Sequence, residues 1–250
     1  MIHETNARPL NVNQQSELPF VRDMFDHIAP RYDFLNRLLS LRRDVFWRRV
    51  LVHALELTAA SQVLDVACGT CDVGLAIMEG LQGRVSVIGV DFSTRMLALA
   101  KTKLTKSNQH QAIRLAAADA FWLPFARSSF DAVTMAFGIR NIQNKLAALQ
   151  GLREVLKPGG RLAILELATP ESGVLRSIYL TYFNRLLPFI GRFFSKHHFA
   201  YTYLPDSVAH FPSAPGFASL MRQAGFEHVR YRFLTLGVAV VFVGDKGGIR

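Results

Sequence analysis

The middle of the chain contains four apolar runs that are almost continuous rather than alternating with polar positions: 63–66, 85–90, 113–117 and 130–135. Such runs are typical of parallel strands that are buried on both faces. Helical spacing separates most of them, notably over 93–106, with Ser93 as the expected N-cap, and over 145–156, which Lys157-Pro-Gly-Gly160 should stop. With a fifth strand over 161–167, this order predicts an α/β fold with a parallel sheet.

The segments on either side of this region have different patterns. Over 17–49 the apolar residues recur at intervals of three and four, which predicts helices with one buried face that form a cap ahead of the sheet. After Thr169 the alternation of strands and helices stops, and 174–203 is a segment rich in aromatic and basic residues. We interpret this segment as an insertion.

The C-terminal part returns to regular elements. A helix is expected over 214–224, ended by Gly225, and the apolar runs 229–233 and 237–243 are joined closely enough to be antiparallel neighbours. The whole pattern predicts one structural domain, divided as follows: a disordered tail over 1–16, a helical cap over 17–58, and an α/β domain over 59–250 with an insertion over 170–212.

The composition limits the classes of binding partner but does not select one of them. The 250 residues are 50% hydrophobic, enough for a sizeable core, and 29 Lys and Arg against 19 Asp and Glu give a formal charge of +10. This charge favours nucleic acid, an anionic membrane surface or acidic metabolites. The first residues lack an apolar signal core, and no run reaches the roughly 18 apolar residues that cross a bilayer. We therefore expect a cytoplasmic protein whose membrane contact, if any, is peripheral.

The sequence VLDVACGTCD over 63–72 carries the first functional signal. A strand, a turn of small residues and a helix, followed by a second strand that ends in Asp91, form the arrangement with which doubly wound sheets bind nucleosides. Gly69 is the position where φ can be freely positive, and the turn's backbone amides are expected to face an anionic group of the ligand. The dinucleotide fingerprint G-x-G-x-x-G is absent, so a dinucleotide is the weaker choice.

Three acids follow three successive strands: Asp65, Asp91 and Asp119. Asp91 is expected to accept hydrogen bonds from both ribose hydroxyls, and Asp119 is expected to accept one from an exocyclic amino group of adenine. Together they suit S-adenosyl-L-methionine, whose sulfonium is positive. Taken singly, each also has a structural explanation as a turn cap, a helix N-cap or a loop residue.

The only cysteines, Cys68 and Cys71, form a Cys-x-x-Cys at the start of a helix and offer a different function. A helix N-terminus can depress a thiol pKa, so dithiol redox chemistry is an alternative. A zinc site needs two more ligands, and no second pair of cysteines exists. We prefer the interpretation that both are small residues lining a tight turn, and we expect no metal.

From about Phe25 to Val243 the chain resembles the ubiquinone/menaquinone C-methyltransferases, a branch of the class I S-adenosylmethionine-dependent methyltransferases. The segments that carry this resemblance are 25–33 (FDHIAPRYD), VLDVACGTCD, 123–125 (LPF), 136–141 (AFGIRN), 155–161 (VLKPGGR), 201–204 (YTYL) and 211–213 (FPS). The resemblance implies a Rossmann-like, seven-stranded, mostly parallel sheet with an antiparallel last strand. It implies cofactor contacts at Thr70, Asp91, Asp119 and Ala120, and at Ala136, where serine is common.

The chain departs from the family pattern at a few positions. Cys71 stands where glycine is usual, Arg42 and Arg43 replace a Gly-apolar pair, Phe199 replaces an acid, and Thr202 breaks a usual Tyr-Arg-Tyr. The Cys71 difference concerns the cofactor turn, where we expect weaker binding at most. The others concern the substrate.

The activity implied by the resemblance is methyl transfer to a ring carbon of a prenylated quinol. Arg140 is the expected partner of the developing oxyanion, with Asn141 beside it as a neutral donor, and Tyr32 and Asp33 are expected to orient the quinol or accept its proton. The alternatives are a structural salt bridge from Arg140 to Glu166, and packing and capping for Tyr32 and Asp33. His197 and His198 are further candidate bases.

The insertion bears on the membrane and on rival functions. Its aromatics are interleaved with basic residues, as in interfacial helices, and could meet the bilayer that holds an isoprenoid tail; the basic residues are Arg176, Arg185, Arg192 and Lys196. The alternative is that they cover the active site or form a homodimer contact. An RNA methyltransferase is disfavoured because the usual amino-methylating motif and a Pro-Cys nucleophile are absent, so no nucleic-acid partner is expected. A cofactor-binding protein that has lost catalysis, marked by Cys71, remains the other alternative.

Overall fold

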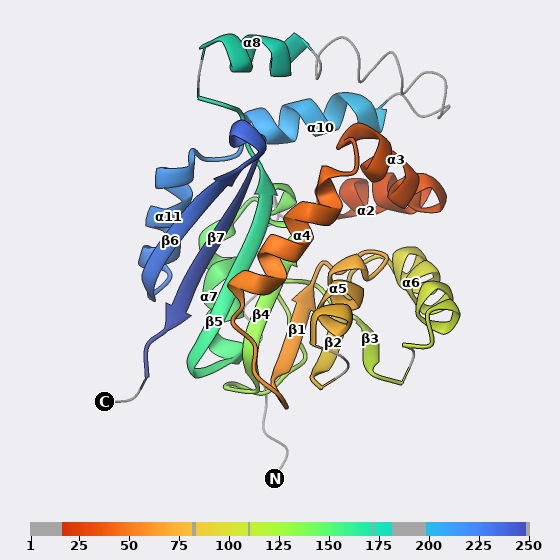
Figure 1. The fold of residues 1–250 in the computed structure, drawn as a ribbon, viewed down its shortest axis with the longest axis vertical. Helices are drawn as coiled ribbons and strands as arrows, with labels where there is room; N and C mark the ends of the chain where they lie inside the picture. The colour runs from red at the N-terminus through yellow and green to blue at the C-terminus, as the bar shows by residue number, and fades with distance from the viewer. Residues whose placement is uncertain (1–16, 82–83, 110, 172, 182–198, 249–250) are drawn as a thin grey trace.

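The computed structural model describes residues 17–81, 84–109, 111–171, 173–181 and 199–248. At its centre is a seven-stranded sheet in the order β3-β2-β1-β4-β5-β7-β6 (Figure 1). The strands are β1 (Gln62–Val66), β2 (Ser86–Asp91), β3 (Ile113–Ala117), β4 (Phe130–Ala136), β5 (Leu156–Leu167), β6 (Phe226–Leu234) and β7 (Ala239–Lys246). The pairs from β3 to β5 are parallel, and β7 is antiparallel to both β5 and β6. The sheet and its antiparallel last strand confirm the expected fold.

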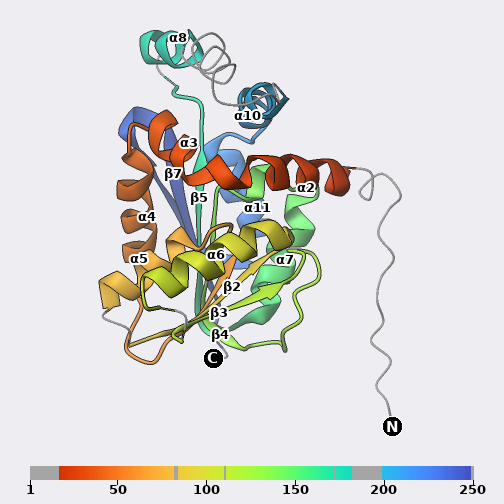
Figure 2. The same ribbon diagram turned by 90° about the vertical axis from the view of Figure 1, so that its right-hand side faces the viewer.

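Helices cover both faces of the sheet (Figures 1 and 2). On one face lie α4 (Arg43–Ala54), α5 (Asp72–Leu81) and α6 (Thr94–Lys106); on the other lie α7 (Lys145–Val155) and α11 (Ala214–Gln223). Each face has its own apolar core, because β-strand side chains alternate between the two faces. Ser93 is the N-cap of α6, as predicted, and its hydroxyl accepts from the Met96 amide at 3.0 Å.

The remaining helices lie over the carboxyl ends of the parallel strands (Figure 2). They are α2 (Glu17–Ile28), the short 3-10 helix η1 (Ala29–Arg31), α3 (Tyr32–Leu39), α8 (Gly173–Thr181) and α10 (Phe199–Ala209). The predicted cap over 17–58 therefore occupies two places: α2, η1 and α3 lie over the strand ends, whereas α4 lies on a face of the sheet. Its last helix, α4, packs on the sheet face against β5 and β7, where Trp47 and Leu51 join the apolar core and Asp44 and Arg48 are buried as an ion pair.

Several element boundaries differ from the sequence prediction; for example, β6 begins at Phe226 rather than 229, and β7 extends to Lys246 rather than 243. Strand β5 begins at Leu156 rather than 161, because Leu156 pairs with Phe130 before a bulge leads into the regular ladder. The insertion forms α8 and α10, while the stretch 182–198 between them, with His197 and His198, and the expected tail over 1–16 lie outside the described residues. In the part of the chain that the structure describes, no helix has the length and apolar character needed to span a bilayer.

Candidate functional site

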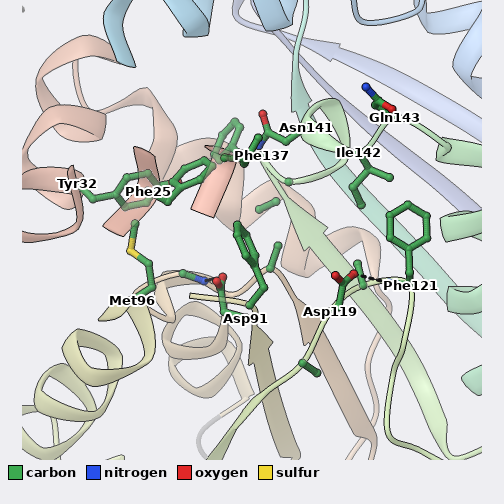
Figure 3. Close-up of a pocket in the computed structure, with 18 residues that line it drawn as sticks. Phe25, Tyr32, Asp91, Met96, Asp119, Phe121, Phe137, Asn141, Ile142 and Gln143 are labelled. Atoms are coloured by element: carbon green, nitrogen blue, oxygen red, sulfur yellow. Dashed lines mark hydrogen bonds between the residues drawn. The ribbon is translucent and has the colours of Figure 1, made fainter. Parts of the chain in front are cut away.

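The candidate site lies where the direction of strand order reverses. From β1 the chain proceeds through β2 and β3 on one side, and from β4 to β5 on the other, so a crevice opens at the carboxyl ends of β1 and β4. A pocket with about 960 Å³ of empty space occupies this crevice, and we call it the strand-end pocket (Figure 3). Its walls include Phe25, Tyr32, Ala67, Gly69, Asp91, Phe92, Met96, Asp119, Ala120, Phe121, Ala136, Phe137, Asn141 and Ile142.

Asp91 organises the turn after β1. Its carboxylate accepts from the Gly69 amide at 2.8 Å and from the Ser93 amide at 2.9 Å. The Cys68 and Cys71 amides also donate within the protein, to Val90 and Cys68 carbonyls. These three turn amides are thus already paired, contrary to the expectation that they face an anionic ligand group. Burial raises the pKa of Asp91, although the Ser93 and Gly69 amides oppose this, and the carboxylate remains on the pocket wall.

Asp119 lies across the pocket from Asp91 (Figure 3). One oxygen of its carboxylate accepts from the Phe121 amide at 2.9 Å, which fixes the loop after β3. The Phe121 ring and the Ile142 side chain line the same part of the pocket (Figure 3). An apolar wall with a carboxylate at its edge suits a flat ring that carries a polar amino group. Ala120 and Ala136, which were predicted as cofactor contacts, also line this pocket.

Asp65 and Thr70 are not among the residues that line the strand-end pocket. Asp65 is completely buried, and neither of its carboxylate oxygens has a hydrogen-bond partner among the described residues. Burial, reinforced by the negative charge of Asp91 and opposed by Arg48, raises the pKa of Asp65 to about 8. Asp65 is thus a neutral acid within the core at physiological pH.

We expect Asp65→Asn to change how the stability of the protein depends on pH. Because the folded pKa lies above the unfolded value of 3.8, the contribution of Asp65 is fully present below pH 4 and is lost as pH rises towards 8. Asparagine is neutral at every pH, so the stability of the variant relative to the natural protein should increase over this pH range. One pKa unit corresponds to about 1.4 kcal/mol. The melting temperature of Asp65→Asn minus that of the natural protein should therefore increase by at least about 3 °C between pH 5 and pH 8.5. A difference that stays constant with pH would contradict the assignment.

Thr70 instead connects the turn to the cap. Its hydroxyl donates to Asp33 at 2.6 Å, and the Lys103 ammonium lies 2.6 Å from Asp33 and 2.5 Å from Asp72. Asp33 is thereby engaged in an ion pair and lines neither of the two pockets described here. Asp33 therefore does not line the pockets where a ring could bind, and its contacts connect the cap to Thr70 and Lys103.

A second pocket, with about 970 Å³ of empty space, lies beneath the cap helices, and we call it the cap pocket. Its walls are largely apolar and are formed by Met24, Phe25, Ile28, Tyr32, Leu35, Asn36, Leu39, Ser40, Asp44, Trp47, Phe137, Arg140, Leu167, Tyr203, Leu204 and Val238.

Three aromatic side chains, Phe25, Tyr32 and Phe137, line both pockets and form the boundary between them. Phe25 and Tyr32 meet edge to face, with ring centroids 6.1 Å apart. Phe137 has a φ of 59°, a left-handed conformation that is strained for an aromatic residue, and its amide is held by the Leu165 carbonyl at 2.8 Å. Strain of this kind is found at sites that hold a side chain in one orientation. Here the side chain is that of Phe137, at the boundary between the two pockets.

Arg140 lies on the wall of the cap pocket. Its guanidinium donates to Glu166 at 2.8 Å and to the Phe137 carbonyl at 2.6 Å, so the salt bridge considered as its structural alternative is present. Burial alone would lower the pKa of Arg140, but the charge of Glu166 and its hydrogen bond to Arg140 outweigh it and raise that pKa. Arg140 is consequently a fixed cation that cannot accept a proton.

Asn141 and Tyr32 complete the polar part of the boundary. Asn141 lines the strand-end pocket, and its side-chain oxygen accepts from the Tyr203 hydroxyl at 3.1 Å. Burial raises the pKa of Tyr32, although Asn36 and the charge of Arg140 oppose this, so its phenol stays protonated and is not a proton acceptor. Tyr203 was not among the predicted site residues, although it lies in the YTYL segment that supports the family resemblance.

The cysteine pair does not have the features of a redox site. Both thiols are buried and free. The hydrogen bond with Cys71, together with burial, raises the pKa of Cys68 well above its usual value, whereas dithiol exchange needs a depressed one. Cys71 has a φ of 67°, which is a conformation that glycine adopts more easily. Among the described residues, no group of three or more His, Cys, Asp or Glu side chains is placed to hold a metal ion.

Comparison with known proteins places this geometry in context. Residues 10–246 match the model of the ubiE/COQ5 methyltransferase family. The chain is 47% identical over 227 residues to the ubiquinone/menaquinone biosynthesis C-methyltransferase UbiE of Geobacter sulfurreducens, which covers 91% of this chain and 88% of the relative. It is 46% identical over 223 residues to the demethylmenaquinone methyltransferase of Thermus thermophilus, covering 89% of this chain and all of the relative (100%).

Solved structures show the same fold at low identity. The [4+2]-cyclase SpnF superposes with a TM-score of 0.70 and 15% identity, covering 92% of this chain and 96% of that one. A SAM-dependent methyltransferase from Thermotoga maritima, described as a possible histamine N-methyltransferase, gives a TM-score of 0.61 and 22% identity, covering 90% of this chain and 98% of that one. At these identities the likeness concerns the fold alone.

Proposed function

The chain belongs to the ubiE/COQ5 methyltransferase family, and we propose that this methyltransferase transfers the methyl group of S-adenosyl-L-methionine to a ring carbon of a prenylated quinol. The observation that supports this most is the pair of pockets that share one aromatic boundary. One pocket carries carboxylates at successive strand ends, and the other is apolar with a buried cation. A nucleoside cofactor and a greasy aromatic substrate would meet at that boundary.

The strand-end pocket fits S-adenosyl-L-methionine through its own donor set. Asp91 offers carboxylate oxygens to ribose hydroxyls, and Asp119 offers one beside the Phe121 and Ile142 wall to an adenine amino group. The aromatic faces of Phe25, Tyr32 and Phe137 suit a positively charged sulfonium at the boundary. When bound, the cofactor supplies an electrophilic methyl group.

The cap pocket supports the reaction by positioning and by electrostatics. A phenol titrates near pH ~10, so its loss of a proton needs stabilisation of the anion. Arg140 provides a permanent positive charge on the wall of a largely apolar pocket, where such a charge stabilises an oxyanion and so makes the quinol anion, with its electron-rich ring carbon, easier to form. Tyr32 and Asn141 would orient the ring against the boundary. Since neither Arg140 nor neutral Tyr32 accepts a proton, we assign its removal to solvent.

The proposed activity is tested by incubating the purified protein with S-adenosyl-L-methionine carrying a labelled methyl group and a reduced, demethylated prenyl quinol. Mass spectrometry of the product should show one added methyl group on a ring carbon. A methyl group on oxygen, or labelling of RNA instead of the quinol, would contradict the proposal. Tight cofactor binding in calorimetry without any turnover would favour the alternative of a protein that has lost catalysis.

We further propose that the protein works at a membrane surface, because a prenyl tail resides in a bilayer. Leu41 and Leu236 are 79% and 73% exposed, and both have left-handed backbone conformations at the tips of turns. Trp47 of α4 donates to Thr235 at 2.7 Å, which holds the turn between β6 and β7 beside the first turn of α4. In Figures 1 and 2 both tips lie at the end of the molecule that carries α8.

The charge at this end matches an anionic bilayer. Arg42 and Arg43 are exposed next to Leu41, and the neighbouring residues Ser40 and Asp44 line the cap pocket. An apolar tip flanked by arginines is typical of interfacial binding, and it would place the pocket next to the lipid.

We expect Arg42→Glu with Arg43→Glu to reduce binding to vesicles containing anionic lipid by at least about thirtyfold, since each basic residue near such a surface contributes about 1 kcal/mol. The matched control is Lys106→Glu with Arg127→Glu, which makes the same change in charge at exposed positions near the amino ends of the strands. Flotation of both variants with vesicles measures the effect. Equal loss in the two pairs would mean that net charge alone, and not this surface, drives binding.

A further inference from the structure

Two hydrogen-bond donors in the cap pocket lack acceptors. Nδ2 of Asn36 and Nε of Arg140 are both buried, and neither has a hydrogen-bond partner among the described residues. Buried donors in folded proteins are almost always paired, so an unpaired one calls for an explanation. From this pair we propose that Asn36 is a substrate-recognition residue, and that its amide donates to one ring oxygen of the quinol while Arg140 holds the other.

Ser40, Asp44 and Tyr203, which also line the cap pocket, are already paired. Ser40 donates to Asp44 at 2.8 Å, and Asp44 also forms ion pairs with Arg37 and Arg48. The Tyr203 hydroxyl donates to Asn141. The unpaired donors are thus not a general property of this pocket, but belong to two particular side chains.

The two donors lie on different walls of the pocket. Asn36 is one helical turn beyond Tyr32 on α3, so the two side chains lie on the same face of that helix, and both line the cap pocket. Arg140 comes from the 3-10 helix η2 (Ile139–Asn141) that follows β4, at the end of the sheet. The neighbouring polar side chain on α3 is Tyr32, whose pKa Asn36 acts to lower, but Nδ2 of Asn36 does not meet hydrogen-bond geometry with that hydroxyl. A ring placed between α3 and η2 would present an oxygen to each donor.

The two donors differ in a way that fits the two oxygens of a quinol. Arg140 carries a charge and so favours the oxygen that becomes an anion, whereas the neutral amide of Asn36 suits an oxygen that keeps its proton and accepts through a lone pair. Pairing both oxygens fixes the ring in its plane, and this decides which carbon faces Phe137 and Tyr32. This assignment rests on the proposed quinol methylation.

The test compares two substrates in the natural protein and in Asn36→Leu, which has a similar shape but no donor. One substrate is a reduced quinol with a short prenyl tail; the other is the same ring without the oxygen that is remote from the methylated carbon. Loss of one hydrogen bond should lower kcat/KM on the quinol by about 10-fold, and should change kcat/KM on the one-oxygen ring by less than about 2-fold. Cofactor affinity and melting temperature should not change.

Two further variants make the result decisive. Leu39→Ala, also on α3 and also on the pocket wall, has no polar atom to lose and should affect both substrates by the same factor. Asn36→Asp keeps the side-chain shape and replaces the donor with an acceptor, so it should lose at least as much activity on the quinol as Asn36→Leu. An equal loss on both substrates, or no loss on the quinol, would overturn the assignment of Asn36. Failure of the proposed function would look different, because the natural protein would then methylate neither ring.

Discussion

Arg140→Lys should lower turnover by about a hundredfold while leaving the affinity for S-adenosyl-L-methionine within a factor of about two. The guanidinium simultaneously donates to Glu166 and to the Phe137 carbonyl, and its Nε remains for a ligand. A lysine ammonium is a point charge on a flexible chain and cannot satisfy these directions together. Single-turnover measurements with saturating cofactor, together with calorimetric titration, separate the two effects.

Lysine is chosen because it preserves the charge opposite Glu166, which is completely buried. An uncharged replacement would leave that carboxylate unpaired in the core and would damage the fold. Arg153→Lys is the matched control, since Arg153 makes one hydrogen bond, to the Gly225 carbonyl at 2.9 Å, and lines neither pocket. Unchanged turnover in Arg140→Lys would remove Arg140 from the mechanism.

Asp91→Ala should weaken cofactor binding by at least about a hundredfold. The substitution removes the acceptor for the ribose and leaves the Gly69 and Ser93 amides without their partner, so the turn loses its shape as well. Isothermal titration measures the affinity directly, and circular dichroism confirms that the sheet is intact.

Asp131→Ala provides the comparison for Asp91→Ala. Asp131 is the second residue of β4 and pairs with Lys157. It lies at the amino end of the strand, whereas the pockets lie at the carboxyl end, and it lines neither pocket. Its loss should not alter the affinity for the cofactor. If Asp91→Ala binds the cofactor as well as Asp131→Ala does, the strand-end pocket has been assigned wrongly.

The strands were predictable because burial on both faces leaves a local signature in the sequence. Runs such as 63–66 and 130–135 lie within β1 and β4, and the Ser93 N-cap follows from a side chain that bonds its own helix. The place of α4 was not predictable in the same way. A helix with one apolar face needs a partner, but its sequence does not say whether that partner is a cap or a sheet.

For the site, strand order placed Asp91 and Asp119 on the pocket wall, because residues that end parallel strands share one edge of the sheet. The same argument wrongly placed Asp65 on the pocket wall. Asp65 lies within β1 rather than at its end, and its side chain is buried in the core. Asp33 and Lys103 are 70 positions apart, and their ion pair depends on how the cap settles on α6. Asn36 was visible only as a donor without an acceptor, which needs three-dimensional information.

The ion pairs beneath α3 have a consequence for how the protein melts. Asp33 is bound to Lys103 of α6, and Arg37 to Asp44 of α4 and to Asp72 of α5. Helix α3 cannot detach without separating charges that are partly shielded from water. Helix α3, which forms one wall of the cap pocket, should therefore lose its structure together with the sheet, in a single cooperative transition, instead of fraying first as loosely attached helices do.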